Sequence, residues 1–417
     1  MNDAVKTILK PIASLRLTVW LLAMSMFLVF AGTLAQVDQG IWTVTRQYFR
    51  SPVTLIDLQL FVPDDLFQWE KVVGFRPLLP FPGGFVVGTL LLINLLAAHT
   101  VRFKFNWKRS GVLLIHTGII LLLAGEAVTA LFSEEGNMTI FEQGYANYAE
   151  DIRSTELAFV NAADADHNVV AVVPDNLLTR RDVIADEALP LDVEVVQWFP
   201  NADLTGPMAG GIIAPNLATA GLGTRVRVAP KPIVAGVDLD SEPNRPAAYV
   251  RLSKQGEDQG IYLVSQLLID QDIDIAGSTW QLGLRFKRDY KPYEIHLEDF
   301  RHDKFTGTNT PKNFSSDVRL IDPAASVDRH AHISMNHPMR YQGEAFFQAQ
   351  YMPGDQGTVL LVVDNPGWLA PYIACIVVTL GLIIHFGMAL IRFINKRSAA
   401  WPAQTKPTCN LSPKTNP

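Results

Sequence analysis

The stretch LTVWLLAMSMFLVFAGTLA at residues 17–35 decides how this chain folds, because it is long and apolar enough to cross a membrane. A helix needs about 20 apolar residues to cross a hydrocarbon core about 30 Å thick. The end of this stretch, residues 31–36, also has the small residues of a secretory cleavage site. A signal core has only about 7–15 apolar residues, and further apolar runs follow here, so we predict a retained helix.

Three further apolar runs lie at residues 85–98, 111–132 and 368–391. The run at 85–98 is the shortest and contains Asn94, and it reaches membrane-spanning length only with its flanking residues. Only 18% of the residues are charged, against about 25% in a soluble domain, and the deficit is concentrated in these runs. We therefore predict four transmembrane helices.

Basic residues indicate the orientation, because they concentrate on the cytoplasmic side of membrane proteins. One basic cluster precedes the first run, one lies between the second and the third, and one follows the fourth. They are, in this order, Lys6, Lys10 and Arg16; Arg102, Lys104, Lys108 and Arg109; and Arg392, Lys396 and Arg397. Four crossings with both termini inside place all three clusters in the cytoplasm. We expect a multi-pass protein of the bacterial inner (cytoplasmic) membrane with its large domain on the periplasmic, outer side.

The segment before the fourth run is predicted to form a β-rich domain. Its strands are rich in valine, leucine and aromatic residues, with near-alternation of polar residues, and sheet-on-sheet packing would bury them in a sandwich-like fold. The clearest strands are LDVEVVQWF (191–199), TRVRVAP (224–230), AAYVRLSK (247–254), SDVRLI (316–321) and GTVLLVV (357–363). A stretch rich in glycine and alanine, 205–223, is expected to be a long loop.

These patterns predict five parts. They are a cytoplasmic N-terminus at 1–16, transmembrane helices one to three with a short outer loop at 17–132, an extracytoplasmic β-rich domain at 133–366, a fourth transmembrane helix at 367–392 and a cytoplasmic tail at 393–417. In the outer loop, GIWTVTRQYF at 40–49 has Ile41, Val44 and Tyr48 at helical spacing. It is either a short helix on the outer membrane surface or an ordinary amphipathic linker.

Three histidines lie within the predicted helices, namely His99, His116 and His385. At 1.5 Å rise per residue they lie about 5, 9 and 10 Å from the cytoplasmic ends of their helices, so they share one layer of the membrane. Ionisable residues at such depth usually face the bundle interior, and neutral imidazole is an axial ligand of haem iron. We therefore take His116 and His385 as candidate haem-iron ligands, and His99 as a further haem-binding candidate. The alternative is that each only hydrogen-bonds a neighbouring helix, or, for His99, lies at the interface.

Other chemistry is sparse in the sequence. His330, His332 and His337 cluster in RHAHISMNHP, where an exposed strand is the more common explanation than a metal site. The two cysteines, Cys375 and Cys409, form no redox pair and lie outside the β-rich segment. No catalytic constellation or nucleic-acid motif is present, so we expect no catalytic residue in this chain and no nucleic-acid partner.

A series of short motifs resembles the ResB-type cytochrome c biogenesis proteins over nearly the whole chain. The first helix closes with Gly32-Thr33 and Gln36, a basic loop leads to His116 and Gly118, and Glu142-Gln143-Gly144 opens the β-rich segment. The most specific part is MNHPMRYQGEAFFQAQY at 335–351, followed by DNPGW at 364–368. Glu126 departs from the pattern, because an apolar or small residue is expected there.

The resemblance implies one half of a two-component, System II haem-attachment complex. The expected partners are a ResC/CcsA-type membrane protein with a Trp-rich haem-handling motif and apocytochrome c, and the expected cofactor is haem b, transported or transiently bound. This chain has eight tryptophans but no Trp-rich cluster, so it would be a non-autonomous subunit of a cytochrome c haem lyase. His116 best matches the membrane histidine of the family, whereas His385 is inferred from depth alone.

Two alternatives remain open at this point. One is a structural membrane assembly subunit without haem contact. The other is a sensor, in which the β-rich domain binds a ligand and signals through the helices. The short predicted tail, which contains proline and lysine, leaves little room for an output domain and disfavours the sensor.

Overall fold

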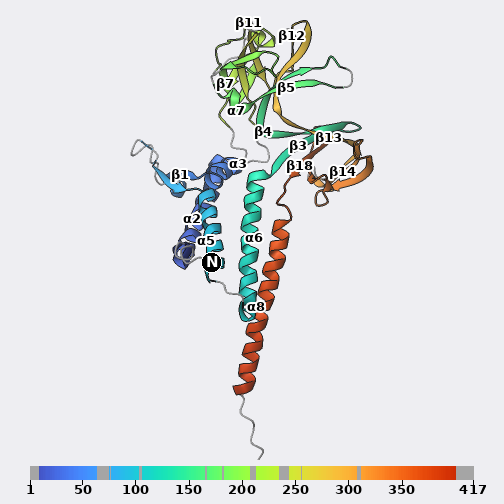
Figure 1. Ribbon diagram of the computed structural model, residues 1–417. Helices are drawn as coiled ribbons and strands as arrows, with labels where there is room; N and C mark the ends of the chain where they lie inside the picture. Colours follow the sequence, from blue (N-terminus) through green and yellow to red (C-terminus); the bar gives the residue numbers. More distant parts are fainter. Residues whose placement is uncertain are drawn as a thin grey trace, which may run out of the picture. The chain divides into compact units, whose positions relative to one another are not determined.

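The computed structural model of the protein describes residues 9–62, 75, 77–102, 106–164, 167–180, 183–206, 213–233, 244–254, 256–307 and 311–400. Parts of the predicted N-terminus and tail, and Cys409, lie outside these residues. The chain divides into a helical unit, Met1–Ala31, Gln47–Leu131 and Gly367–Pro417, and a β unit, Gly32–Arg46 and Phe132–Pro366 (Figure 1).

Four helices of the described residues are long and apolar enough to cross a membrane. They are α2 (Leu15–Gln39), α5 (Gly84–Arg102), α6 (Ser110–Phe132) and α8 (Ala370–Ala400). Exposed aromatic side chains lie at helix ends, with Trp107 before α6 and Trp368 and Tyr372 around the start of α8, as is common at membrane–water interfaces. The predicted fold class, four membrane helices and a large β-rich part, is confirmed.

Short elements follow α2 along the chain. They are α3 (Ile41–Val44), the π-helix η1 (Thr45–Phe49), β1 (Val53–Asp57), η2 (Leu58–Phe61), β2 (Leu78–Pro82) and, before α6, η3 (Trp107–Arg109). Of the face predicted at 40–49, Val44 and Tyr48 are fully covered by protein, whereas Ile41 is exposed. Protein packing rather than contact with a membrane surface therefore accounts for the two buried side chains.

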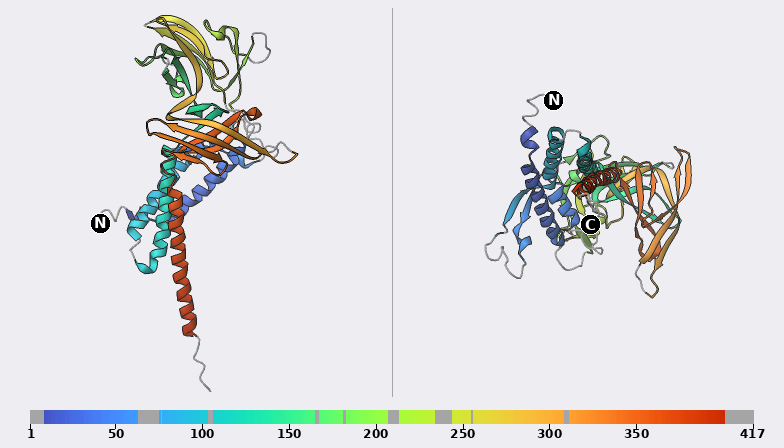
Figure 2. Two further views of the ribbon diagram at one scale, coloured as in Figure 1. Left: turned by 90° about the vertical axis from the view of Figure 1, so that its right-hand side faces the viewer. Right: turned by 90° about the horizontal axis from the view of Figure 1, so that it is seen from below.

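The β unit consists almost entirely of antiparallel strands, visible from two sides in Figures 1 and 2. Its elements are β3 (Glu134–Phe141), β4 (Tyr145–Asn161), β5 (Val169–Pro174), α7 (Asp175–Leu178), β6 (Val183–Ile184), β7 (Asp192–Phe199), β8 (Ala202–Thr205), η4 (Leu222–Arg225), β9 (Arg227–Pro230), β10 (Ala247–Lys254), β11 (Glu257–Ser265), β12 (Gln271–Ile275), β13 (Ser278–Lys304), β14 (Pro311–Asp322), β15 (Val327–Ser334), β16 (Met339–Tyr341), β17 (Glu344–Tyr351), η5 (Pro353–Asp355) and β18 (Gly357–Asp364).

Two long strands, β4 and β13, connect two hydrophobic cores within the β unit. In one core, residues of the β11-β10-β7-β6 sheet such as Val250 pack against residues of β4, β5, β12 and β13 such as Leu282, which is the predicted sandwich. In the other, the sheet β15-β14-β13-β4-β3-β18-β17-β16 encloses Ile295, Phe346 and Leu360. The pairing of β13 with β4 shifts register after Phe286, between the portions that serve the two cores.

Candidate functional site

Helices α6 and α8 pack with their backbones in direct contact along glycine residues. Gly111, Gly118 and Gly125 recur every seven residues on α6 and are buried. A Cβ atom added at Gly118 would lie 2.5 Å from Val378 Cγ2 on α8, and one added at Gly125 would lie 2.4 Å from Ala370 Cβ. Small residues at a membrane helix interface allow such close approach. We call this contact the α6–α8 seam.

Helices α2 and α5 are joined instead by a buried amide. Asn94 of α5 is 1% exposed and accepts a hydrogen bond from the Thr18 hydroxyl of α2 at 2.7 Å. Its Nδ2 donates to the carbonyl oxygens of Ile12 and Ser14, where the chain enters α2. Polar side chains buried in membrane helices are stabilised by such bonds to a neighbouring helix. The contact fixes which face of α5 lies against α2.

The histidines of α5 and α6 lie near each other. His99 and His116 lie close enough for charges on their two rings to interact, although they are 17 positions apart in the sequence. Nδ1 of His116 lies 2.8 Å from the carbonyl oxygen of Val112, one turn earlier in α6. A neutral ring that donates from Nδ1 has its lone pair on Nε2, the nitrogen that can bind a metal.

His385 lies at a similar position along the helix axes, but it contacts the start of α6. Its backbone packs on Gly111 in the α6–α8 seam, five residues before His116, which is about 7–8 Å along the helix axis at 1.5 Å per residue. Its ring makes an edge contact with the ring of Phe386. The structure therefore places His99 within electrostatic range of His116 and holds His385 closer to the start of α6. Glu126 of α6 is exposed and far from all three.

The stretch with the most specific family resemblance forms the β16–β17 hairpin and anchors it to the rest of the β unit. Gln342 and Gly343 form its two-residue turn, with positive φ angles of 47° and 92°, as such hairpins require. The Tyr341 hydroxyl donates to Asp322 Oδ2 at 2.7 Å, which lowers the pKa of that carboxyl. Gln348 accepts a hydrogen bond from Ser316 on β14 and donates one to Thr358 on β18.

Glu344, at the start of β17, is the centre of a buried charge network with β13. It accepts hydrogen bonds from Lys291 Nζ and the Tyr293 hydroxyl, and Lys291 also binds Asp289 at 2.5 Å. Burial lowers the pKa of Lys291, but its bonds to Asp289 and Glu344 outweigh this and raise it above the ordinary value. The pKa of Tyr293 is raised by burial and by Glu344.

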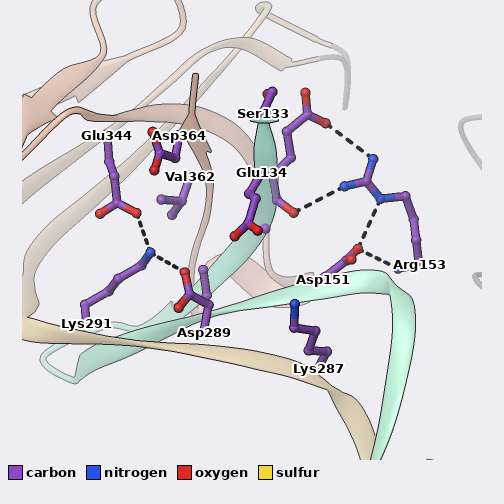
Figure 3. A pocket seen from close by; sticks show the side chains of 13 residues that line it. Ser133, Glu134, Asp151, Arg153, Lys287, Asp289, Lys291, Glu344, Val362 and Asp364 are labelled. Atoms are coloured by element: carbon purple, nitrogen blue, oxygen red, sulfur yellow. Dashed lines mark hydrogen bonds and ion pairs between the residues drawn. The ribbon is translucent and has the colours of Figure 1, made fainter. Parts of the chain in front are cut away.

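A small charged cavity borders this network, as Figure 3 shows with Lys291 between Glu344 and Asp289. Asp364 on β18 lies directly opposite Glu134 on β3 and Glu344 on β17, so three carboxylates stand in register across three strands. The cavity has a volume of about 150 Å³. Pockets for drug-sized ligands have about 300–1,000 Å³, so this cavity is too small for a porphyrin.

The histidines of the β unit bind carboxylates of their own. His330 and His332 share one face of β15, as predicted, but His330 Nδ1 lies 2.8 Å from Glu298 and His332 Nδ1 lies 2.6 Å from Asp317. Among the described residues no group of three histidine, cysteine or acidic residues is placed to hold a metal ion. His302, which the sequence did not single out, is the most buried: its ring is 2% exposed and Nδ1 binds Asp355 at 2.7 Å.

Two comparisons with known proteins each match part of the chain. Residues 259–367, from β11 to the residues before α8, match the model of the ResB-like family. A segment of 116 residues is 29% identical to Protein NrfI of Wolinella succinogenes, covering 28% of this chain and 12% of that protein. The match thus spans about an eighth of the relative's length.

Four membrane-length helices and an antiparallel β unit define a multi-span membrane protein with a large β-rich part. The family match and the similarity to Protein NrfI agree with the ResB-type resemblance noted in the sequence: residues 259–367 are similar to the ResB-like family.

Proposed function

We propose that this chain binds haem within the membrane and delivers it for attachment to apocytochrome c. The observation that carries the proposal is the proximity of His99 and His116, on two membrane-length helices, in a chain that resembles ResB-type proteins. Imidazole is a natural axial ligand of haem iron, and ionisable groups inside membrane helices usually serve function. Haem is the cargo here, and His385 would contact it from α8, closer to the start of α6.

The partner in this proposal is a ResC/CcsA-type membrane protein with a Trp-rich haem-handling motif. The basic clusters at Arg109 and Arg392 favour the bacterial inner membrane with the histidine layer on the cytoplasmic side. The β unit would then lie outside and position the apocytochrome or brace the partner.

The attachment reaction itself needs no residue of this chain as a nucleophile. Each thiol of the apocytochrome's Cys-x-x-Cys-His segment adds across one haem vinyl group, so that sulfur bonds to carbon and the thiol proton ends on the neighbouring vinyl carbon. The substrate supplies both sulfurs. Cys375 lies within α8 and Cys409 follows it, so neither belongs to the β unit. This chain would hold and orient haem as a subunit of the lyase.

The test is haem content in the complex purified with its membrane partner. His116→Ala and His99→Ala should each lower haem absorbance per protein by at least about tenfold, a loss typical when a metal site is weakened. Thr117→Val is the matched control, because Thr117 neighbours His116, is exposed, and likewise bonds the carbonyl one turn earlier. Full haem content in both histidine variants would refute the proposal and favour a structural subunit without haem contact.

A further inference from the structure

The backbones of α6 and α8 approach each other most closely at His385. A Cβ atom added at Gly111 would lie 2.6 Å from the backbone nitrogen of His385, 2.8 Å from its Cα and 2.7 Å from the carbonyl oxygen of Gly381. From the other helix, a Cβ atom at Gly381 would lie 2.8 Å from the backbone nitrogen of Ile115. These neighbours are backbone atoms, so no change of rotamer can make room for a side chain.

The rest of the seam is built differently. At Gly125 the nearest atom is Ala370 Cβ, and the nearest backbone atom is 3.7 Å away, so a side chain sets the spacing there. At Gly118 the nearest atom is Val378 Cγ2 at 2.5 Å, and the nearest backbone atom, the carbonyl oxygen of Ala374, is 3.0 Å away, farther than at Gly111. Gly387, also on α8, has nothing within 4 Å of the position of its Cβ atom. The requirement for two glycines in backbone contact therefore coincides with the level of one candidate haem-binding histidine.

We propose that Gly111 and Gly381 are positioning residues for the haem-binding layer, because their backbone contact sets where α8 holds His385 relative to His116. This inference rests on the proposed function. Alanine at Gly111 would have to push the His385 backbone away by about 0.8 Å to reach an ordinary contact of 3.4 Å. Binding groups need placement within about 0.5 Å, so such a displacement moves His385 out of productive geometry.

Intrinsic helix propensity acts in the opposite direction. Alanine is favoured over glycine in a helix interior by about 1 kcal/mol, so Gly111→Ala would strengthen α6 if packing did not matter. A loss of haem in this variant would therefore come from the helix contact and not from a weaker helix. The same substitution at Gly387 gains the same propensity without meeting any neighbour, which makes it a matched control.

The experiment compares Gly111→Ala, Gly387→Ala and Gly125→Ala in the complex purified with its partner. Gly111→Ala should lower haem content about tenfold and change the shape of the haem absorbance bands, as expected when the ligand environment is disturbed. Gly387→Ala should leave both unchanged. Gly125→Ala should lower the midpoint of thermal unfolding but keep the haem bands, and Ala370→Gly should restore that midpoint, because only the Ala370 side chain is in the way.

Unchanged haem bands in Gly111→Ala would overturn the proposal. So would an equal loss of haem in Gly125→Ala, because the seam would then act only as a scaffold. A second measurement separates this inference from the function on which it rests. It is the distance between spin labels attached at the exposed positions Ile119 and Leu382, in protein with both native cysteines replaced by serine.

The distance between these labels is measured in haem-free protein, and it should increase in Gly111→Ala but not in Gly387→Ala. An unchanged distance refutes the positioning role by itself. A wild-type complex that carries no haem refutes the proposed function and, with it, the role of Gly111 in haem binding, even where the label distance shifts as expected.

Discussion

Replacing Glu344 by glutamine tests the buried charge network that ties β17 to β13. The side chains of Glu344 and Lys291 are 9% and 10% exposed, and Tyr293 shares the same carboxylate. Glutamine keeps the shape and can still accept a hydrogen bond, but it removes the negative charge. Lys291 is then left with Asp289, whose side chain is 54% exposed, as its only partner within this network.

Removing one partner of a buried ion pair typically costs about 3–5 kcal/mol, and we expect the lower end, about 3 kcal/mol, because Asp289 remains. For a unit of 150–250 residues this corresponds to a decrease of about 6–12 °C in the unfolding midpoint. The measurement is thermal unfolding of the full chain in detergent. Glu194→Gln is the control, because its pair with Arg251 is 38–41% exposed and such pairs contribute at most about 1 kcal/mol.

The pH dependence of the unfolding midpoint provides a second test of the same network. The folded-state pKa of Lys291 is raised above 10.5, so its contribution is complete below that pH and is lost as pH rises through the folded value. Glu344→Gln should move this alkaline loss to lower pH. The double variant Lys291→Met/Glu344→Gln should be more stable than Glu344→Gln alone, since no partly paired charge stays buried. Equal midpoints for Glu344→Gln and Glu194→Gln would refute the reasoning.

Two further predictions concern other contacts. Asn94→Leu removes the hydrogen bonds that join α5 to Thr18, Ile12 and Ser14, and it should lower the free energy of unfolding by about 1–2 kcal/mol, measured by thermal unfolding. Thr89→Val is the control and should be near neutral, because it loses only a hydrogen bond within α5. The hydrogen bond from His302 holds the pKa of Asp355 below its ordinary range, so its contribution is present above about pH 4 and is lost as pH falls through the folded value. Asp355→Asn should therefore weaken the acid-side dependence of the unfolding midpoint, and an unchanged dependence would contradict this origin.

Length and apolarity were enough to predict the helices, because a membrane-spanning segment needs only a long run of apolar side chains. The ends were less certain, since α8 continues to Ala400 through Arg392 and Lys396, residues that are good helix formers but are not apolar. The glycines of the α6–α8 seam were visible as a seven-residue repeat at Gly111, Gly118 and Gly125. That repeat alone did not say which helix packs on them.

The strands most central to the β unit were the hardest to predict. β13 extends from Ser278 to Lys304 and carries many charged residues, and it bends at register shifts where it passes from one core to the other. Its charges are satisfied across strands, for example Arg285 with Glu156 and Arg288 with Glu150. Such cross-strand pairs join residues more than 120 positions apart, and periodicity along one strand contains no information about them.

The sequence predicts the depth of the three histidines in their helices, but not the direction in which their side chains point. Depth follows from sequence position, because each residue adds 1.5 Å along a helix, and on that basis the sequence predicts one layer for the three histidines. The direction in which a side chain points around the helix axis depends on which helix faces pack together. Here the face of α5 that carries Asn94 packs against α2, and the face of α6 that carries Gly111 packs against α8. His99 lies within electrostatic range of His116, although its position near the end of its helix made it the weakest of the three candidates in the sequence. A test of haem binding therefore needs a variant of His99 as well as one of His116.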